Sequence, residues 1–235
     1  MFKLFASCDS VYLNQHAPAL AASAACAGNN LHLHVINASP AEVDFLHFLS
    51  EKWEKMTDAN FTFSWGDMFT SAKDKEQLRT IFACDRFVTV GNRLRYTDDT
   101  YLVIDTDCLV MKKIEEPTGQ IGLFVRESLE GTQGWESRGT KIAAGAVYYS
   151  RDAVEFAEEV AFRIRKGPVL WFLDQVAISE TYEKHISNYR FDYFDSQFMD
   201  WEFVEGTTIW TGKGPRKYDN STYLTKKNHF DRMIR

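Results

Sequence analysis

Apolar and polar positions along the first half of the chain alternate between short strand-like runs and longer helical patterns. Short apolar-rich runs predict strands, and apolar residues spaced three or four apart predict helices. We expect strands at residues 2–6, 31–36, 60–64 and 101–104, and helices at 17–27, from 40 onward and at about 75–90. This β/α alternation predicts a mostly parallel, Rossmann-like central sheet flanked by helices, the α/β class.

The clearest helix start is Ser39-Pro40-Ala41-Glu42, which has the capping-box pattern with proline at the first helical position. In the second half we expect strands at 121–126, 142–149 and 205–211 and helices at 150–166 and 174–184. A chain of 235 residues suits one domain, residues 1–235. We expect a nucleotide-binding half at 1–110, followed by a second half at 111–235.

Net charge and apolar length exclude several classes of protein. The formal charge of −6 argues against a general nucleic-acid binder. No apolar stretch reaches the length of a membrane span, and the N-terminal apolar run is too short for a signal peptide, so we expect a cytoplasmic protein. The four cysteines form no C-x-x-C pair and are expected to be buried, reduced thiols. Residues 211–235 carry seven Lys or Arg, which predicts a place for an anionic ligand.

The triplet Asp105-Thr106-Asp107 directly follows the apolar run 101–104. Side chains at i and i+2 of a strand point the same way, so both carboxylates are expected to face one ion beyond the end of a central strand. Mg²⁺ and Mn²⁺ take oxygen ligands, and one or two carboxylates with substrate phosphates are often enough. The alternative is a polar turn without function, because a D-x-D triplet alone is common.

Five further motifs stand in order along the chain around this triplet. They are Ala6-Ser7-Cys8-Asp9-Ser10-Val11-Tyr12, Asp85-Arg86-Phe87, Ile142-Ala143-Ala144-Gly145-Ala146-Val147-Tyr148-Tyr149-Ser150, Trp171-Phe172-Leu173-Asp174-Gln175-Val176-Ala177 and Thr211-Gly212-Lys213-Gly214-Pro215-Arg216-Lys217. Together with D-x-D they resemble the GT-A-fold glycosyltransferases of family 8, the glycogenin and lipopolysaccharide galactosyltransferase group. The resemblance covers most of the chain and implies a GT-A fold, in which residues 111–235 form the donor-sugar and acceptor half.

The resemblance also assigns roles to residues. It implies metal ligation by Asp105 and Asp107, catalytic roles for Gln175, Asp174 and Lys217, and nucleotide or donor binding by a longer set. That set is Ser7, Asp9, Tyr12, Arg86, Asp105, Thr106, Ala144, Gly145, Gly214 and Lys217. Asp9 and Tyr12 would contact the uracil, Arg86 and Lys217 the diphosphate, and the Ala144-Gly145 pair the donor sugar.

The chain departs from the family pattern at several of these motifs. Val11 and Ala143 stand where the family has Asn, and Val176 where it has a second Asp. Thr211 replaces the family's metal-binding His, and Tyr218 its proline. His229 or water are candidates for the vacant ligand position, although a lone histidine near a C-terminus is more often a surface residue.

The resemblance implies transfer of a hexose, glucose or galactose, from a UDP-sugar with retention at the anomeric carbon and with Mn²⁺ or Mg²⁺ as cofactor. An amide is a poor nucleophile, so we favour front-face attack by the acceptor, with Gln175 stabilising the cation-like sugar. The acceptor, whether carbohydrate, protein or lipid-linked, is left open; Glu130, Trp135 and Glu136 are candidates to line its side. The alternatives are a catalytically degenerate sugar-nucleotide-binding module and a haloacid-dehalogenase-like phosphatase.

Overall fold

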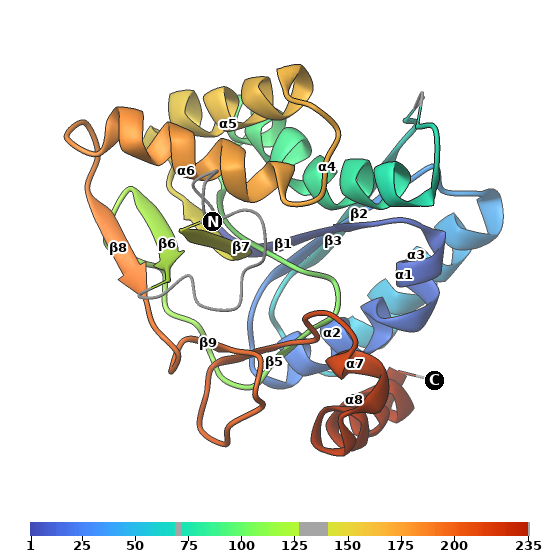
Figure 1. The fold of residues 1–235 in the computed structure, drawn as a ribbon. Coiled ribbons are helices and arrows are strands. Elements are labelled where there is room, and N and C mark those ends of the chain that lie inside the picture. Colours follow the sequence, from blue (N-terminus) through green and yellow to red (C-terminus); the bar gives the residue numbers. More distant parts are fainter. Residues whose placement is uncertain (69–71, 127–140, 235) are drawn as a thin grey trace. The chain divides into compact units, whose positions relative to one another are not determined.

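The computed structural model describes residues 1–68, 72–126 and 141–234 (Figure 1). The chain divides into two compact units. Unit 1 comprises residues 1–2, 69–103 and 116–195, and unit 2 comprises residues 3–68, 104–115 and 196–235. Each unit is therefore built from segments that lie far apart in the sequence.

Seven strands belong to the main sheet, in the order β3-β2-β1-β4-β7-β6-β8. β1 pairs in parallel with β2, β2 with β3, and β6 with β8, whereas β6 and β7 are antiparallel. The mostly parallel α/β sheet confirms the predicted fold class. The strands are β1 (Phe2–Cys8), β2 (Leu31–Ile36), β3 (Phe61–Gly66), β4 (Thr100–Ile104), β6 (Ile121–Val125), β7 (Ile142–Tyr149) and β8 (Phe191–Phe194).

Among the described residues, unit 2 also contains a small three-stranded sheet, in the order β5-β10-β9, and five helices. Helix α2 is rich in alanine and is buried along nearly its whole length. Its small side chains let α8 and β5 pack closely against it. The small-sheet strands are β5 (Cys108–Val110), β9 (Met199–Asp200) and β10 (Ile209–Thr211). The helices are α1 (Ser10–Gln15), α2 (Ala17–Cys26), α3 (Pro40–Glu54), α7 (Arg216–Asp219) and α8 (Ser221–Ile234).

Three long helices in unit 1 pack side by side, as the upper part of Figure 1 shows. They are α4 (Lys75–Tyr96), α5 (Val154–Lys166) and α6 (Leu173–His185), and a short 3₁₀ turn, Arg151–Ala153, precedes α5. Gly91 permits the close α4–α5 approach, because a Cβ there would lie only 3.2 Å from the Ala157 carbonyl oxygen.

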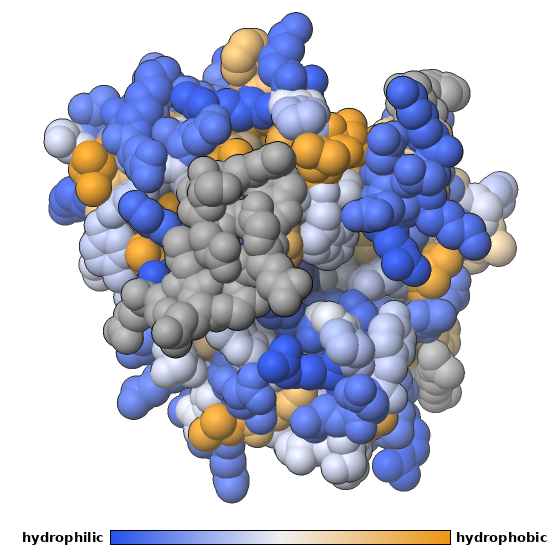
Figure 2. Space-filling view, in the orientation of Figure 1, coloured by the Kyte–Doolittle hydropathy of each residue, from blue (hydrophilic) through white to orange (hydrophobic). Residues whose placement is uncertain are grey.

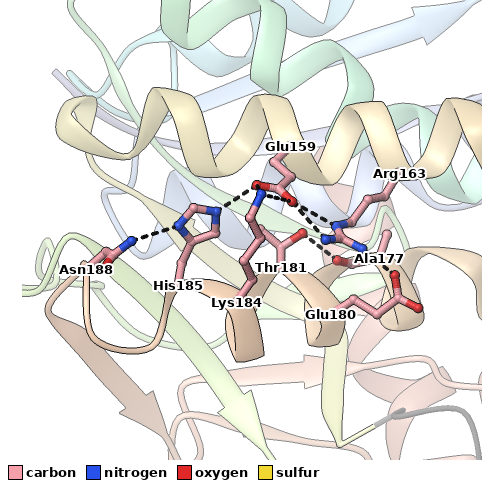
Figure 3. Close-up of polar contacts among 8 residues, drawn as sticks. All are labelled: Glu159, Arg163, Ala177, Glu180, Thr181, Lys184, His185 and Asn188. Atoms are coloured by element: carbon pink, nitrogen blue, oxygen red, sulfur yellow. Dashed lines mark hydrogen bonds and ion pairs between the residues drawn. The ribbon is translucent and has the colours of Figure 1, made fainter.

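Helices α5 and α6 are joined by a charged network centred on Glu159 (Figure 3). Its carboxylate accepts hydrogen bonds from Arg163 at 2.8 Å, Lys184 at 2.8 Å and His185 at 2.7 Å. Burial alone would raise the pKa of Glu159, but these three donors outweigh it and lower the pKa to about 2. The network joins the C-terminal end of α6 to α5.

The predicted elements are largely confirmed, with corrections at their ends and in the C-terminal segment. The ranges at 31–36 and 142–149 agree with β2 and β7, and the Ser39 N–H donates to Glu42 at 2.7 Å, as the capping-box pattern predicts. The last predicted strand is wrong over most of its length, since β10 covers only Ile209–Thr211. The sequence pattern also missed the helices α1, α7 and α8 and the strands β5, β8 and β9. The proposed division into halves at residue 110 stays a prediction.

The surface in Figure 2 is mostly hydrophilic, with exposed apolar side chains in small separate groups. Within the described ranges, the structure contains no helix with the length and apolar character needed to cross a bilayer. Cys8, Cys84 and Cys108 are buried free thiols as expected, whereas Cys26 is exposed, which corrects that expectation. Its place in the last turn of α2 leaves its side chain at the helix end.

Candidate active site

In unit 2 the triplet Asp105-Thr106-Asp107 forms a turn between β4 and β5. Residues 105–107 lie outside both strands, so strand alternation does not set the directions of their side chains, and the expectation that both carboxylates face one ion stays a prediction. Asp107 is buried, and Asp105 is partly buried. The Thr106 hydroxyl donates to the Ser7 carbonyl at 3.1 Å, which ties the turn to the end of β1. Thr106 is thus a structural anchor of the turn.

Asp107 forms an ion pair with Lys217, and both residues belong to unit 2. The Lys217 ammonium donates to Asp107 Oδ2 at 2.6 Å and to the Tyr12 hydroxyl at 2.7 Å. Only 10% of the lysine side chain and 7% of the aspartate side chain are exposed. Burial by itself would lower the pKa of Lys217, but the charge and hydrogen bond of Asp107 and the bond to Tyr12 outweigh it and raise the pKa. The lysine is therefore a charged, largely desolvated cation at neutral pH.

Aromatic rings and a glycine shape the surroundings of this ion pair. The ammonium lies 4.9 Å from the centroid of the Tyr12 ring and 5.6 Å from that of Tyr218. Gly212 donates its N–H to the Asp107 carbonyl at 3.1 Å, and the Tyr223 hydroxyl donates to the same oxygen at 2.7 Å. A Cβ on Gly212 would lie 2.9 Å from Lys217 Cβ and 3.0 Å from the Asp107 carbonyl oxygen, so the close approach needs glycine.

The His16 ring packs against the Tyr12 ring, with centroids 4.9 Å apart, and His16 is only 3% exposed. Neither ring nitrogen has a hydrogen-bond partner among the described residues. Burial first, and then the charges of Lys217 and Lys227, lower the pKa of His16 to about 4. A neutral imidazole therefore supports the Tyr12 ring at neutral pH.

Two other sequence-predicted residues in unit 2 have local backbone roles. Asp9 is the N-cap of α1, and its Oδ1 accepts the Tyr12 N–H at 2.9 Å, so it fixes the helical turn that carries Tyr12. Gly214 has a φ of 65°, the left-handed region that glycine adopts without strain. It forms the turn between β10 and α7, and α7 carries Lys217.

In unit 1 a second cluster brings together Arg86, Ala144 and Asp174. Arg86 Nη2 donates to Asp174 Oδ2 at 3.0 Å and to the Ala144 carbonyl at 3.1 Å. The two charged side chains are 9% and 10% exposed. Arg86 therefore joins α4 to β7 and to the first turn of α6, beside Gly145; its predicted contact with a diphosphate stays a prediction.

The next residue, Gln175, is held from the other side. Its Oε1 accepts from Arg126 Nη2 at 3.0 Å, and its backbone N–H donates to Asp174 Oδ1 at 2.8 Å. Burial lowers the pKa of Arg126. Phe172, which precedes this first turn of α6, has a φ of 71°, a conformation that costs a bulky residue on the order of 1 kcal/mol.

The sequence reasoning missed Arg126, Gly212, Tyr223 and His16. No local pattern marks them: Arg126 follows β6, and Tyr223 lies on a helix that the sequence pattern did not predict. The candidates Glu130, Trp135 and Glu136 lie outside the described residues. His229 is exposed on α8, the ordinary place for a surface histidine.

The D-x-D turn carries two carboxylates, those of Asp105 and Asp107, and their binding of a divalent cation stays a prediction. Among the described residues, no group of three His, Cys, Asp or Glu side chains is placed to hold a metal ion. Thr211, which stands where the motif has His, is buried beside Cys108. Two carboxylates with phosphate oxygens suffice for Mg²⁺ or Mn²⁺, so the donor set fits a cation that shares its shell with a diphosphate.

Comparison with solved structures finds the same fold in glycosyltransferases. The galactosyltransferase LgtC, solved in complex with donor and acceptor sugar analogs, matches with a TM-score of 0.64 and 13% identity over 100% of this chain and 95% of its own. A glycosyltransferase involved in the glycosylation of the major capsid of PBCV-1 matches with a TM-score of 0.54 and 12% identity over 98% of both chains. The apo-form glycosyltransferase GlyE of Streptococcus pneumoniae TIGR4 matches at 0.62 and 12% identity, over 99% of this chain and 61% of its own.

No protein-family model and no curated protein sequence matches the chain. At 12–13% identity the structural matches show the fold alone. The GT-A fold predicted from the motifs is thereby confirmed.

Proposed function

We propose that this protein is a glycosyltransferase of the family 8 type that moves glucose or galactose from a UDP-sugar to an acceptor, with retention. The observation that carries the proposal is the buried Lys217–Asp107 ion pair, whose ammonium contacts Tyr12, in a chain with the fold of glycosyltransferases. A sugar nucleotide needs an aromatic face for its base and a cation for its diphosphate, and unit 2 supplies both within one cluster.

The departing diphosphate gathers negative charge as the anomeric bond breaks, so the main task is to stabilise that charge. In our proposal Lys217 binds the phosphate oxygens, and Tyr12, fixed by the Asp9 cap and supported by His16, lies against the uracil. Asp105 and Asp107 would hold Mn²⁺ or Mg²⁺, which supplies Lewis-acid neutralisation of the diphosphate when bound.

The cluster of unit 1 is proposed to bind the donor sugar. Arg86 holds Asp174 and the Ala144 carbonyl in place, so Asp174 is oriented before the sugar arrives. Arg126 holds the Gln175 carbonyl oxygen, which keeps a second lone pair for the cation-like sugar. Gln175 thus stabilises positive charge without forming a covalent bond, which agrees with front-face attack by the acceptor.

The first experiment is a screen of UDP-glucose and UDP-galactose with and without Mn²⁺, which measures both thermal stabilisation and release of UDP. Proton NMR of the product's anomeric configuration tests retention. Gln175→Ala is expected to lower turnover about a hundredfold while the affinity for UDP stays within about threefold of wild type. Equal losses in turnover and in UDP affinity would contradict the role given to Gln175.

A second candidate is a sugar-nucleotide-binding module without turnover. It is favoured by the guanidinium of Arg126 on the Gln175 oxygen, because a cation beside that oxygen opposes a positive charge on the sugar. UDP binding with no release of UDP from either sugar nucleotide, in the presence of several candidate acceptors, would favour this module. The glycosyltransferase fold gives no support to the phosphatase alternative.

A further inference from the structure

Lys217 forms an ion pair with Asp107, the carboxylate that a divalent cation at the D-x-D turn would need as a ligand. Its ammonium contacts Asp107 Oδ2 at 2.6 Å, and both side chains are at least nine-tenths buried. The lysine is held in addition by the Tyr12 hydroxyl and by the faces of two tyrosine rings. The charge of Asp107 is therefore balanced from within the protein.

This balance has a consequence for the order in which charges enter the site. A divalent cation that arrives alone must either share Asp107 with an ammonium or displace it, and displacement leaves Lys217 desolvated without a counter-ion. Both are unfavourable, because like charges repel strongly where water is excluded and an unpaired buried charge is costly. Asp105 alone is a weak ligand set for such an ion.

A nucleoside diphosphate changes this situation, because it brings its own negative charge to Lys217. Once the ammonium pairs with phosphate oxygens, the Asp107 carboxylate becomes available to the cation. We propose that Lys217 is an exchangeable counter-ion: it pairs with Asp107 in the free protein and moves to the diphosphate when nucleotide and cation bind together. The inference rests on the proposed function and adds a coupling that the function alone does not require.

The coupling is reciprocal, since each ligand raises the affinity for the other by the same factor. The exchange also affects Mn²⁺ binding in the absence of nucleotide. Without Lys217 the Asp107 carboxylate loses its ammonium partner, so the protein should bind Mn²⁺ by itself more tightly than the wild type does.

The test measures Mn²⁺ binding by the loss of the EPR signal of the free ion, for wild type, Lys217→Met and Lys226→Met. Lys226 lies on α8, where its ammonium faces the Phe230 ring at 5.5 Å, so its replacement removes the same charge away from Asp107. We expect Lys217→Met to bind Mn²⁺ at least about tenfold more tightly than wild type, and Lys226→Met to stay within about twofold. Addition of UDP should raise the Mn²⁺ affinity of wild type more than that of Lys217→Met, after correction for Mn²⁺ bound by UDP in solution.

Circular dichroism and melting curves show whether Lys217→Met is folded; Lys217→Gln serves as a second variant, and the wild-type titration needs no variant. Equal Mn²⁺ affinities of wild type and the Lys217 variants would overturn the exchange while leaving the proposed function intact. So would wild-type Mn²⁺ binding that is as tight without UDP as with it. Failure of UDP to bind under any condition would overturn the proposed function and the exchange with it.

Discussion

Replacement of Arg86 by methionine tests the unit 1 cluster most directly. The guanidinium is buried and donates to Asp174 Oδ2 at 3.0 Å and to the Ala144 carbonyl at 3.1 Å. Methionine has a similar length and fills much of the same space, so the main change is the loss of the cation. The Asp174 carboxylate would then remain buried with the Gln175 N–H as its remaining described donor from this cluster.

The loss of one partner of a buried ion pair typically costs about 3–5 kcal/mol, because the other charge is left uncompensated. For a chain of this length, that corresponds to a fall in melting temperature of about 6–20 °C. Arg95→Met on the same helix is the matched control. Arg95 donates to Glu158 at 2.6 Å, but 56% of its side chain is exposed, so its loss should lower the free energy of unfolding far less than the loss of Arg86 does.

The assay is urea unfolding of wild type, Arg86→Met, Arg95→Met and the double variant Arg86→Met/Asp174→Asn. The double variant should be more stable than Arg86→Met alone, since a neutral amide needs no counter-ion. If Arg86→Met unfolded within about 1 kcal/mol of wild type and mainly weakened UDP binding, the positioning role would be refuted. Arg86 would then be the diphosphate ligand that the motif implies.

The remaining predictions concern pH and a glycine. The pKa of Glu159 is lowered to about 2, below its unfolded value of about 4.5, so its stabilisation is full above pH 4.5 and is lost as the pH falls towards 2. Urea unfolding from pH 6 to pH 3 should show wild type losing about 1–2 kcal/mol more than Glu159→Gln; parallel curves would contradict this. Gly212→Ala should weaken UDP binding at least about fivefold in calorimetry, because the new Cβ would clash with the Asp107 carbonyl oxygen and with Lys217 Cβ. An unchanged affinity for UDP would show that the turn can shift.

Local patterns were sufficient where one physical signal dominates a segment. The apolar runs of β2 and β7 and the capping box of α3 were predicted because burial and hydrogen bonding in these segments follow sequence spacing. The C-terminal segment was harder: α8 buries only Tyr223, Phe230 and Ile234, and its apolar face is defined by packing against α2. A helix with so narrow a buried face gives little periodic signal.

The sequence by itself determined the α/β class, the position of the D-x-D triplet after β4 and the order of the motifs, and through them the residues to which a chemical role is assigned. Only the tertiary structure decided which of these residues meet: Lys217 with Asp107 and Tyr12 in unit 2, and Arg86 and Arg126 with Asp174 and Gln175 in unit 1. The physical reason is distance along the chain. Local spacing fixes the face on which a side chain lies, but ion pairs between residues that are 110 positions apart, such as Asp107 and Lys217, form only when the elements that carry them pack.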